Sequence, residues 1–429
     1  MEVFKNVNQE RWTALTERPT IDKDNLSQTV QKILNNVKLD RDKALRAYAK
    51  KFDDVVLDEF LASKSEIDLA KQLVPEELKQ AINVAKQNVE TFHRAQIVDE
   101  AIIETVKGVQ CWRKAVGIEK VGLYIPGGSA PLFSTVLMLG IPAMLANCKE
   151  VVLCTPCNEK GEINPAILYT ANLIGINKIY KIGGAQAIAA MAYGTESISQ
   201  VFKIFGPGNQ FVTKAKELVQ QDGVAIDMPA GPSEVLIIAD KTGNPKYIAA
   251  DLLSQAEHGA DSQVILLSND EIQINKTLNE LDKQVVELPR AETAQKALLN
   301  SKAILLKDIE ECIAFSNLYA PEHLIIASKN TSDYMGEVTN AGSVFLGNYS
   351  CESAGDYASG TNHTLPTNGY ARNYSGVSLE SFQKKITFQK LSKEGIKNIG
   401  PSIEIMAEAE ELYAHKNAVT VRLKDLKNV

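Results

Sequence analysis

Between residues 120 and 350, short apolar runs alternate with helical stretches, and no other feature of the sequence narrows the possible folds as much. Runs rich in β-branched residues have the length of buried strands, among them VGLYIP, EVVLCTP, SEVLIIAD and SQVILLS. The stretches between them have helical character, among them NPAILYTANLIG, AQAIAAMAYG and NQFVTKAKELVQQ. Such alternation indicates parallel sheets flanked by helices. We therefore expect an α/β protein with two Rossmann-like parallel-sheet domains.

The segments on either side of this alternation define the remaining domains. Before it, ALRAYAKKFDD and LKQAINVAKQNVETFHRA repeat apolar residues at helical spacing. Residues 346–378 are rich in Gly, Ser, Asn and Tyr without a helical period, and a loop of this length is usually functional or disordered. A strand and then helices are expected in the small module that follows. The expected divisions are an N-terminal extension over 1–24, a discontinuous first domain over 25–122 and 234–376, a second domain over 123–233 and a C-terminal module over 377–429.

Composition excludes several classes of protein. The 429 residues include 45% hydrophobic and 23% charged residues, which is ordinary globular composition. A net charge of −7 argues against a nucleic-acid partner. No apolar run reaches the roughly 18 residues of a membrane span, and the N-terminus lacks the apolar region of a signal peptide. Six cysteines are too few for a disulfide scaffold, so we expect free thiols and a cytoplasmic location.

Three glycine turns in the second domain are candidates for phosphate binding. Gly127-Gly128, Gly183-Gly184 and Gly206-Pro207-Gly208 each follow a predicted strand, and the last two open helices. Unpaired N–H groups at a helix N-terminus bind phosphate well. None of the turns matches G-x-G-x-x-G, and tight βα turns alone would explain each of them. Together they favour nucleotide binding.

The five histidines and their acidic neighbours locate the candidate chemistry. Gln255 and His258 are expected on one face of a helix that ends at a Gly259 cap. The adjacent Glu322 and His323 precede an apolar strand, and such a pair suits proton transfer. Asp356 and His363 in the glycine-rich loop, with His415 near the C-terminus, are oxygen and nitrogen donors that suit Zn²⁺. These separate signals make a site only if the fold brings them together.

Two other features are expected to have no role in a site. His93 falls on a helical pattern with nothing around it that indicates a site, so we interpret it as a surface or packing residue. Cys154 and Cys157 have the spacing of a redox pair or half a zinc site, but the sequence has no second pair to complete one. Buried or loop thiols are the better interpretation.

Long strings across the chain resemble histidinol dehydrogenase. They include VGLYIPGGSAPLFSTVLM, GGAQAIAAMAYGT, FGPGN, DMPAGPSEVLIIAD, DLLSQAEHGADSQ, APEHL, SAGDYASGTNHTLPT and AEAEELYAHKNAV. The resemblance covers essentially the whole chain, except for a less diagnostic first hundred residues. It implies a zinc-dependent, NAD-linked oxidation of L-histidinol through L-histidinaldehyde to L-histidine, the last steps of histidine biosynthesis.

The resemblance also implies roles for particular residues, with one zinc ion per subunit. The zinc ligands would be Gln255, His258, Asp356 and His415, all of them near the substrate. Proton transfer would fall to Glu322 and His323, the latter also contacting substrate. Tyr124, Gln186 and Asn209 would contact NAD, and Ser233, His363 and Glu410 would contact the substrate. The family forms homodimers in which the C-terminal module crosses to the partner, so Glu410 and His415 would complete the other subunit's site.

The implied chemistry is consistent with these side chains. A neutral His323 can accept the hydroxyl proton, and Glu322 can activate the water that adds to the aldehyde. Zinc would hold the imidazole and amine of the substrate. Three alternatives remain open: a related dehydrogenase acting on another small alcohol such as a sulfonated diol, a zinc hydrolase with Glu322 as base, and a non-catalytic binding protein.

Overall fold

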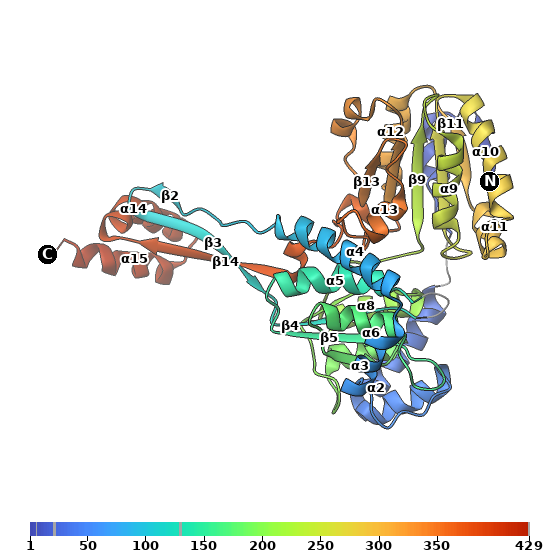
Figure 1. The fold of residues 1–429 in the computed structure, drawn as a ribbon. Coiled ribbons are helices and arrows are strands. Elements are labelled where there is room, and N and C mark those ends of the chain that lie inside the picture. The colour runs from blue at the N-terminus through green and yellow to red at the C-terminus, as the bar shows by residue number, and fades with distance from the viewer. Residues whose placement is uncertain (6, 20–22, 128–130, 428–429) are drawn as a thin grey trace. The chain divides into compact units, whose positions relative to one another are not determined.

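The computed structural model describes residues 1–5, 7–19, 23–127 and 131–427, which form two units (Figure 1). The first unit comprises residues 1–94 and 118–382, and the second comprises 95–117 and 383–429. Within the described residues, the first unit contains two parallel sheets and the second an antiparallel one. The expected pair of parallel-sheet α/β folds is thus confirmed.

A five-stranded parallel sheet has the order β6-β5-β4-β7-β8. Its strands are β4 (Lys120–Tyr124), β5 (Glu150–Thr155), β6 (Lys178–Lys181), β7 (Lys203–Phe205) and β8 (Ala225–Ile226). The helices between them are α5 (Phe133–Leu145), α6 (Pro165–Leu173), α7 (Gly184–Tyr193) and α8 (Gln210–Gln221). Alternate residues of β5 point to opposite faces, so Val152 and Cys154 enter one core while Val151 and Leu153 enter the other. Because the strand order reverses between β4 and β7, their carboxyl ends flank the crevice where such sheets bind ligands.

The early helices cover this five-stranded sheet. They are α2 (Lys23–Phe52), α3 (Lys64–Leu73) and α4 (Glu76–Arg94). The apolar face of α2 packs with α7 and α8 in one core, and α3 and α4 pack with α5 and α6 in the other. This grouping differs from the expected division, which joined 25–122 to 234–376. Helical periodicity identifies the apolar face of a helix but not the sheet that this face covers. The expected domain boundary at residue 122 also falls inside β4.

The six-stranded parallel sheet has the order β1-β11-β10-β9-β12-β13. Its strands are β1 (Glu2–Lys5), β9 (Glu234–Ala239), β10 (Gln263–Ser268), β11 (Lys302–Leu305), β12 (His323–Ala327) and β13 (Ser343–Leu346). Helices α9 (Pro245–Ala256), α10 (Glu271–Val285) and α11 (Ala291–Leu299) pack on one face, and α1 (Trp12–Leu15) and α12 (Ile309–Tyr319) pack on the other. The N-terminal segment therefore supplies an edge strand and a helix to this sheet, which the expected extension over 1–24 did not foresee.

The predicted loop over 346–378 is partly helical. It contains α13 (Glu352–Tyr357) and a 3₁₀ turn at Tyr370–Arg372. Further 3₁₀ turns of the first unit lie at Gln9–Arg11, Thr331–Asp333, Met335–Glu337 and Leu379–Phe382. The short ESAGDY helix escaped notice because its six residues include a glycine and are too few to reveal a period.

The second unit is an antiparallel sheet with two helices. The sheet has the order β14-β3-β2, from β2 (Ile103–Val106), β3 (Val109–Gly117) and β14 (Gln383–Leu391), and it is followed by α14 (Lys393–Ala409) and α15 (Tyr413–Asp425). The predicted strand and helices after residue 377 are confirmed, whereas the contribution of 95–117 was not expected. No helix among the described residues is both long enough and apolar enough to cross a membrane.

Candidate functional site

Glu322 and His323 lie buried at the amino end of β12, with relative exposures of 7% and 2%. Glu322 Oε2 accepts a hydrogen bond of 3.0 Å from the backbone N–H of Glu234, the first residue of the neighbouring β9. His323 Nδ1 lies 3.0 Å from Gln255 Nε2, 3.3 Å from the Glu234 carbonyl oxygen and 3.6 Å from Glu322 Oε2. His323 Nε2 lies 3.5 Å from Asp356 Oδ1. The structure thus places Asp356, which the sequence had singled out separately, beside the Glu322–His323 pair.

The electrostatic surroundings alter both members of this pair. Burial raises the pKa of Glu322 to about 8, although the adjacent imidazole partly opposes the shift. Burial alone would lower the pKa of His323, but the carboxylates of Glu352, Glu322 and Asp356 outweigh it and raise the pKa to about 10. The expected neutral imidazole therefore requires a positive charge among these carboxylates, which is the effect of a bound cation.

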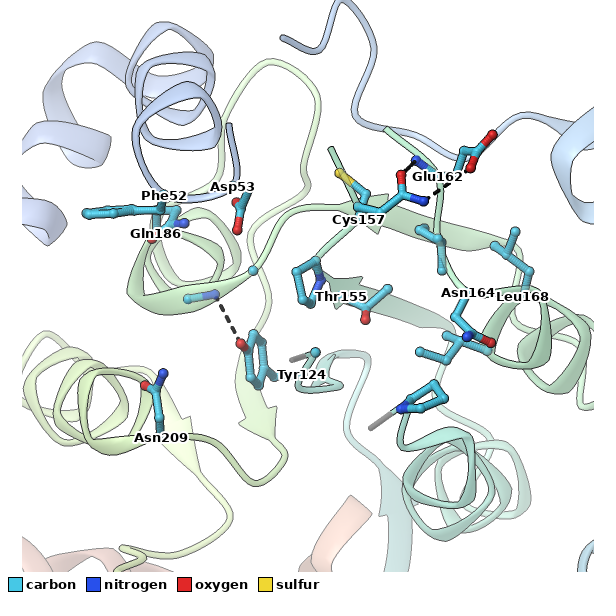
Figure 2. Close-up of a pocket in the computed structure, with 18 of the residues that line it drawn as sticks. Phe52, Asp53, Tyr124, Thr155, Cys157, Glu162, Asn164, Leu168, Gln186 and Asn209 are labelled. Atoms are coloured by element: carbon cyan, nitrogen blue, oxygen red, sulfur yellow. Dashed lines mark hydrogen bonds between the residues drawn. The ribbon is translucent and has the colours of Figure 1, made fainter. Parts of the chain in front are cut away.

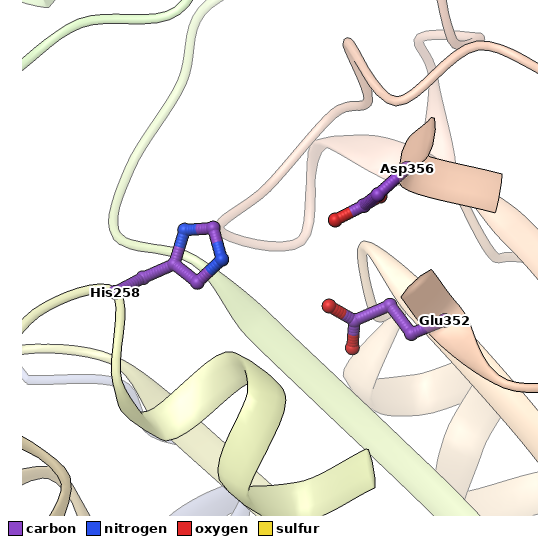
Figure 3. A group of neighbouring side chains, drawn as sticks. All are labelled: His258, Glu352 and Asp356. Carbon is purple, nitrogen blue, oxygen red and sulfur yellow. The ribbon is translucent and has the colours of Figure 1, made fainter. Parts of the chain in front are cut away.

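Ligand atoms of His258, Glu352 and Asp356 lie within 4.8 Å of one another and face a common space (Figure 3). Glu352 and Asp356 are four residues apart on α13, so they lie on one side of that helix. His258 follows the C-terminus of α9, and Gln255 lies buried in the last turn of the same helix. Gln255 donates from Nε2 to Glu352 Oε1 over 2.8 Å.

Several buried polar atoms in this cluster lack a hydrogen-bond partner among the described residues. They are Gln255 Oε1, His323 Nε2, Glu352 Oε2 and Asp356 Oδ1. Buried polar atoms are rarely left unpaired, and four in one place indicate a ligand that satisfies them. Amide oxygen, carboxylate and imidazole donors fit a divalent metal such as Zn²⁺.

One expectation about this cluster is wrong, and one of its residues was missed. Helix α9 ends at Ala256 with Glu257 as its cap, so Gly259 is not the C-cap and His258 lies beyond the helix. Glu352 was not predicted, although its spacing of four residues from Asp356 would have indicated it had α13 been recognised.

Two predicted site residues belong to the second unit. Glu410 caps the C-terminus of α14, and His415 lies in the first turns of α15; both side chains are exposed. Their roles as substrate contact and zinc ligand stay predictions.

The three predicted cofactor residues line one cavity of about 1030 Å³ in the lobe of the five-stranded sheet (Figure 2). Tyr124 is the last residue of β4, Gln186 lies in the first turn of α7, and Asn209 is the N-cap of α8. The Tyr124 hydroxyl accepts a 3.0 Å hydrogen bond from the Gly184 N–H. Burial raises the pKa of Tyr124 to about 12, so the phenol stays neutral.

The predicted glycine turns shape this cavity. Gly183 and Gly184 open α7, and Gly127 also lines the space, whereas Gly128 lies outside the described residues. Gly206 has φ 130°, and a Cβ at this position would lie 2.1 Å from the Tyr124 carbonyl oxygen. Only glycine fits between the ends of β4 and β7.

A second cavity of about 1280 Å³ is lined by Ser233, His258 and Asn209, among other residues. Asn209 therefore borders both cavities, and the second cavity also reaches His258 of the His258–Glu352–Asp356 cluster. His363 is held on both sides, because its Nδ1–H donates to the Asp356 carbonyl oxygen over 2.8 Å and its Nε2 lies 3.0 Å from Thr135 Oγ1. Burial lowers the pKa of His363.

The structure also places His93 and the cysteines, which were expected to have no role in a site. His93 is fully buried, with its Nδ1–H donating to the Val89 carbonyl oxygen over 2.8 Å, so it is a packing residue. The six cysteines are free thiols. Cys154 is buried, whereas Cys157 lines the first cavity, where burial raises the pKa of its thiol to about 11.

Comparison with known proteins gives a consistent result. A family model described as histidinol dehydrogenase matches residues 16–423. A histidinol dehydrogenase from Bacteroides thetaiotaomicron is 57% identical over 427 residues, covering 100% of both sequences, and one from Escherichia coli is 53% identical, covering 99% of this chain and 98% of the relative. The crystal structure of a histidinol dehydrogenase from Elizabethkingia anophelis is 63% identical with a TM-score of 0.98, covering 100% of this chain and 99% of that one.

Proposed function

The chain belongs to the histidinol dehydrogenase family, and we propose that it oxidises L-histidinol to L-histidine in two NAD-linked steps at a zinc site. The observation that carries this proposal is the position of the buried Glu322–His323 pair. The pair adjoins a cluster of buried side-chain atoms that could bind a metal and lack a partner among the described residues. Asn209 lines both the cavity of the predicted cofactor residues and the second cavity, which reaches His258 of that cluster. An acid–imidazole pair can supply the proton transfers that accompany the two hydride removals of such an oxidation.

The metal would be held by Gln255, His258 and Asp356, with Glu352 beside them. When bound, zinc supplies a positive charge that orients the imidazole and amine of histidinol. A second subunit would contribute His415 as a ligand and Glu410 as a contact to the substrate amine. Ser233 and His363 would complete the substrate contacts, and Tyr124, Gln186 and Asn209 would hold NAD.

The two oxidations use the buried pair in different ways. In the first, His323 accepts the hydroxyl proton while the carbinol hydride passes to NAD, which yields the aldehyde and NADH. In the second, Glu322 removes a proton from water as it adds to the aldehyde, and a second hydride passes to another NAD. The product is the carboxylic acid, and the balance is one water and two NAD consumed per histidinol. The burial of Glu322 and His323 limits competing reactions of the aldehyde with solvent.

The three alternative functions would each require a different set of residues. A dehydrogenase for a sulfonated diol would need a cation to bind the sulfonate, and the predicted substrate contacts include the carboxylate of Glu410 instead. A zinc hydrolase would not require the cavity at Tyr124, Gln186 and Asn209. The same holds for a binding protein, which also has no use for an acid–imidazole pair. A cytoplasmic location is also part of the proposal, supported by six free cysteines.

The test is to incubate the zinc-loaded protein with NAD and, separately, L-histidinol, a sulfonated propanediol or no alcohol, while following NADH absorbance. We expect NADH with histidinol alone. His323→Asn should reduce this rate by about 10²–10⁴-fold, as the loss of a general base does. Absence of NADH with histidinol, or a higher rate with the sulfonated diol, would contradict the proposal.

A further inference from the structure

Arg18, which lies close to the N-terminus, is anchored beside the acid–imidazole pair. Its Nε donates to Glu234 Oε2 over 2.6 Å and its Nη2 to Glu234 Oε1 over 3.0 Å, a bidentate pair. The Glu234 side chain is 2% exposed and that of Arg18 is 14% exposed. Ion pairs this well shielded from water hold their geometry more tightly than exposed ones.

Glu234 is the residue whose backbone holds both members of the pair. Its N–H donates to Glu322 Oε2, and its carbonyl oxygen lies within hydrogen-bond distance of His323 Nδ1, at 3.3 Å. Because the side chain of Glu234 is fixed by Arg18, the start of β9 cannot rotate without breaking the bidentate ion pair. The position of both hydrogen bonds to the catalytic pair is therefore tied to Arg18.

The same guanidinium also holds the segment that leads into β12. Arg18 Nη2 donates to the Tyr319 carbonyl oxygen over 2.8 Å, and the guanidinium carbon lies 3.9 Å from the centre of the Tyr319 ring. The Tyr319 hydroxyl donates to Glu234 Oε2 over 2.9 Å. Three residues later the chain reaches Glu322, after Ala320 in a left-handed conformation with φ 54°.

We propose that Arg18 is a positioning residue for the Glu322–His323 pair, acting through Glu234 and Tyr319. It cross-links the two backbone segments, one at the start of β9 and one before β12, whose relative position sets the geometry of the pair. This inference rests on the proposed function, because it assigns Arg18 an effect on both oxidation steps. A displacement of about 1 Å at a catalytic group can cost about 10²-fold in rate.

The test compares Arg18→Ala and Arg18→Lys with the wild-type enzyme in its zinc-loaded form. Arg18→Lys keeps the charge but not the fork of donors, and Arg11→Ala is the matched control, since Arg11 is an exposed arginine of the same segment. Measured quantities are kcat and KM for histidinol and for histidinaldehyde, zinc content and the thermal unfolding midpoint. Each is repeated with added guanidinium, which can enter the space left in Arg18→Ala.

We expect kcat of Arg18→Ala to fall by about 10–100-fold for both steps, while zinc content stays at one per chain and KM changes by less than about threefold. Arg18→Lys should lie between this variant and the wild type. Guanidinium should restore part of the kcat of Arg18→Ala and leave the wild type and Arg11→Ala unchanged. A purely structural role would lower the unfolding midpoint without rescue of kcat.

The inference is overturned by a zinc-loaded Arg18→Ala enzyme with kcat within about twofold of wild type. It is also overturned if guanidinium restores none of the lost kcat. If Arg18→Ala does not fold, Arg18→Lys decides, and a wild-type kcat in that variant overturns the inference. A wild-type enzyme that makes no NADH from histidinol would contradict the proposed function instead, so the two failures are distinguishable.

Discussion

Glu322 and Glu352 are both buried carboxylates beside His323, but they have different hydrogen-bond donors and different neighbours. Burial raises the pKa of each, to about 8 for Glu322 and well above its ordinary range for Glu352. Glu322 accepts a backbone N–H from the neighbouring strand and can exchange a proton near neutral pH. Glu352 accepts the Gln255 amide and faces the metal cluster, where a cation would keep it ionised.

Replacement of Glu322 by Gln separates the two oxidations. The amide keeps the size and the acceptor for the Glu234 N–H but cannot remove a proton from water. Oxidation of histidinaldehyde should therefore fall by about 10²–10⁴-fold, and by more than oxidation of histidinol. Stopped-flow measurements started from each substrate check this, with the exposed Glu292→Gln on α11 as control. Equal losses in both steps would refute the separate role of Glu322.

His258→Asn tests the metal cluster without touching the core. Loss of a residue that only orients a metal ligand lowers metal affinity by about 10–100-fold. Loss of a ligand itself should lower zinc affinity by at least as much. The unfolding transition in denaturant should remain cooperative, because His258 lies outside the apolar cores. Zinc content after dialysis against a chelator measures the effect, and Glu257→Gln, next to it in the chain, is the control. Full activity in a zinc-free preparation would contradict a metal at this site.

At the scale of elements, the turn after β7 presents Asn209 to both cavities and is held by a buried ion pair. Asp227 Oδ2 accepts the Gly206 N–H over 2.8 Å, and Lys216 Nζ donates to the Gly206 carbonyl oxygen over 2.8 Å. Lys216 and Asp227 also pair directly, with side chains only 4% and 1% exposed. The position of Asn209, a predicted cofactor contact, therefore depends on charges that do not themselves line either cavity.

Lys216→Gln should leave the buried Asp227 uncompensated. Breaking a buried pair costs about 3–5 kcal/mol of unfolding free energy, whereas Lys296→Gln, in an exposed pair of α11, should cost less than about 1 kcal/mol. Urea unfolding measures both values, and titration with NAD should show weaker binding only for Lys216→Gln. Equal stability in the two variants would show that the turn is held by something other than this pair.

The elements themselves were predictable where the local pattern decides their structure. Most strands of the two parallel sheets follow from β-branched apolar runs, and the glycine turns follow from their position after those strands. The short β1 and β8 were not expected. Which elements pack together was not predictable, because helical periodicity shows that α2–α4 have an apolar face but does not show which sheet that face covers. The pairing of β3 with β14 joins residues more than 260 positions apart, and no pattern within either segment of the sequence indicates it.

The candidate site shows the same limit. His258 and Asp356 were each weak signals alone, since nothing in their own neighbourhoods shows that α9 and α13 meet. Glu352 went unnoticed because its helix was interpreted as loop. The resemblance to a family, and not the spacing of donors, linked these residues into one expected site.

At the scale of the whole molecule, the active site is expected to need two copies of the chain. His415 and Glu410 are exposed on the second unit, where neither has a described partner that a metal or substrate would displace. A two-fold dimer that exchanges these modules would contain two identical composite sites. Each composite site would need His258 from one chain and His415 from the other.

Complementation between two inactive variants tests this arrangement. His258→Ala and His415→Ala homodimers should each be nearly inactive, since each lacks a predicted zinc ligand in both sites. Co-refolded mixtures should regain roughly a quarter of wild-type activity, because a random half of the dimers are mixed and each has one intact site. Mass spectrometry of intact dimers confirms mixing. If mixed dimers form and remain inactive, His415 serves its own chain.

The central claim is that one site carries out both oxidations, and the stoichiometry of NADH tests it most directly. A limiting amount of L-histidinol is converted to completion by the zinc-loaded enzyme with excess NAD, in the presence of an aldehyde-trapping reagent. We expect two NADH and one L-histidine for each histidinol, with no trapped aldehyde, because the two steps together consume two NAD. One NADH per histidinol, with trapped aldehyde and no histidine, would contradict it.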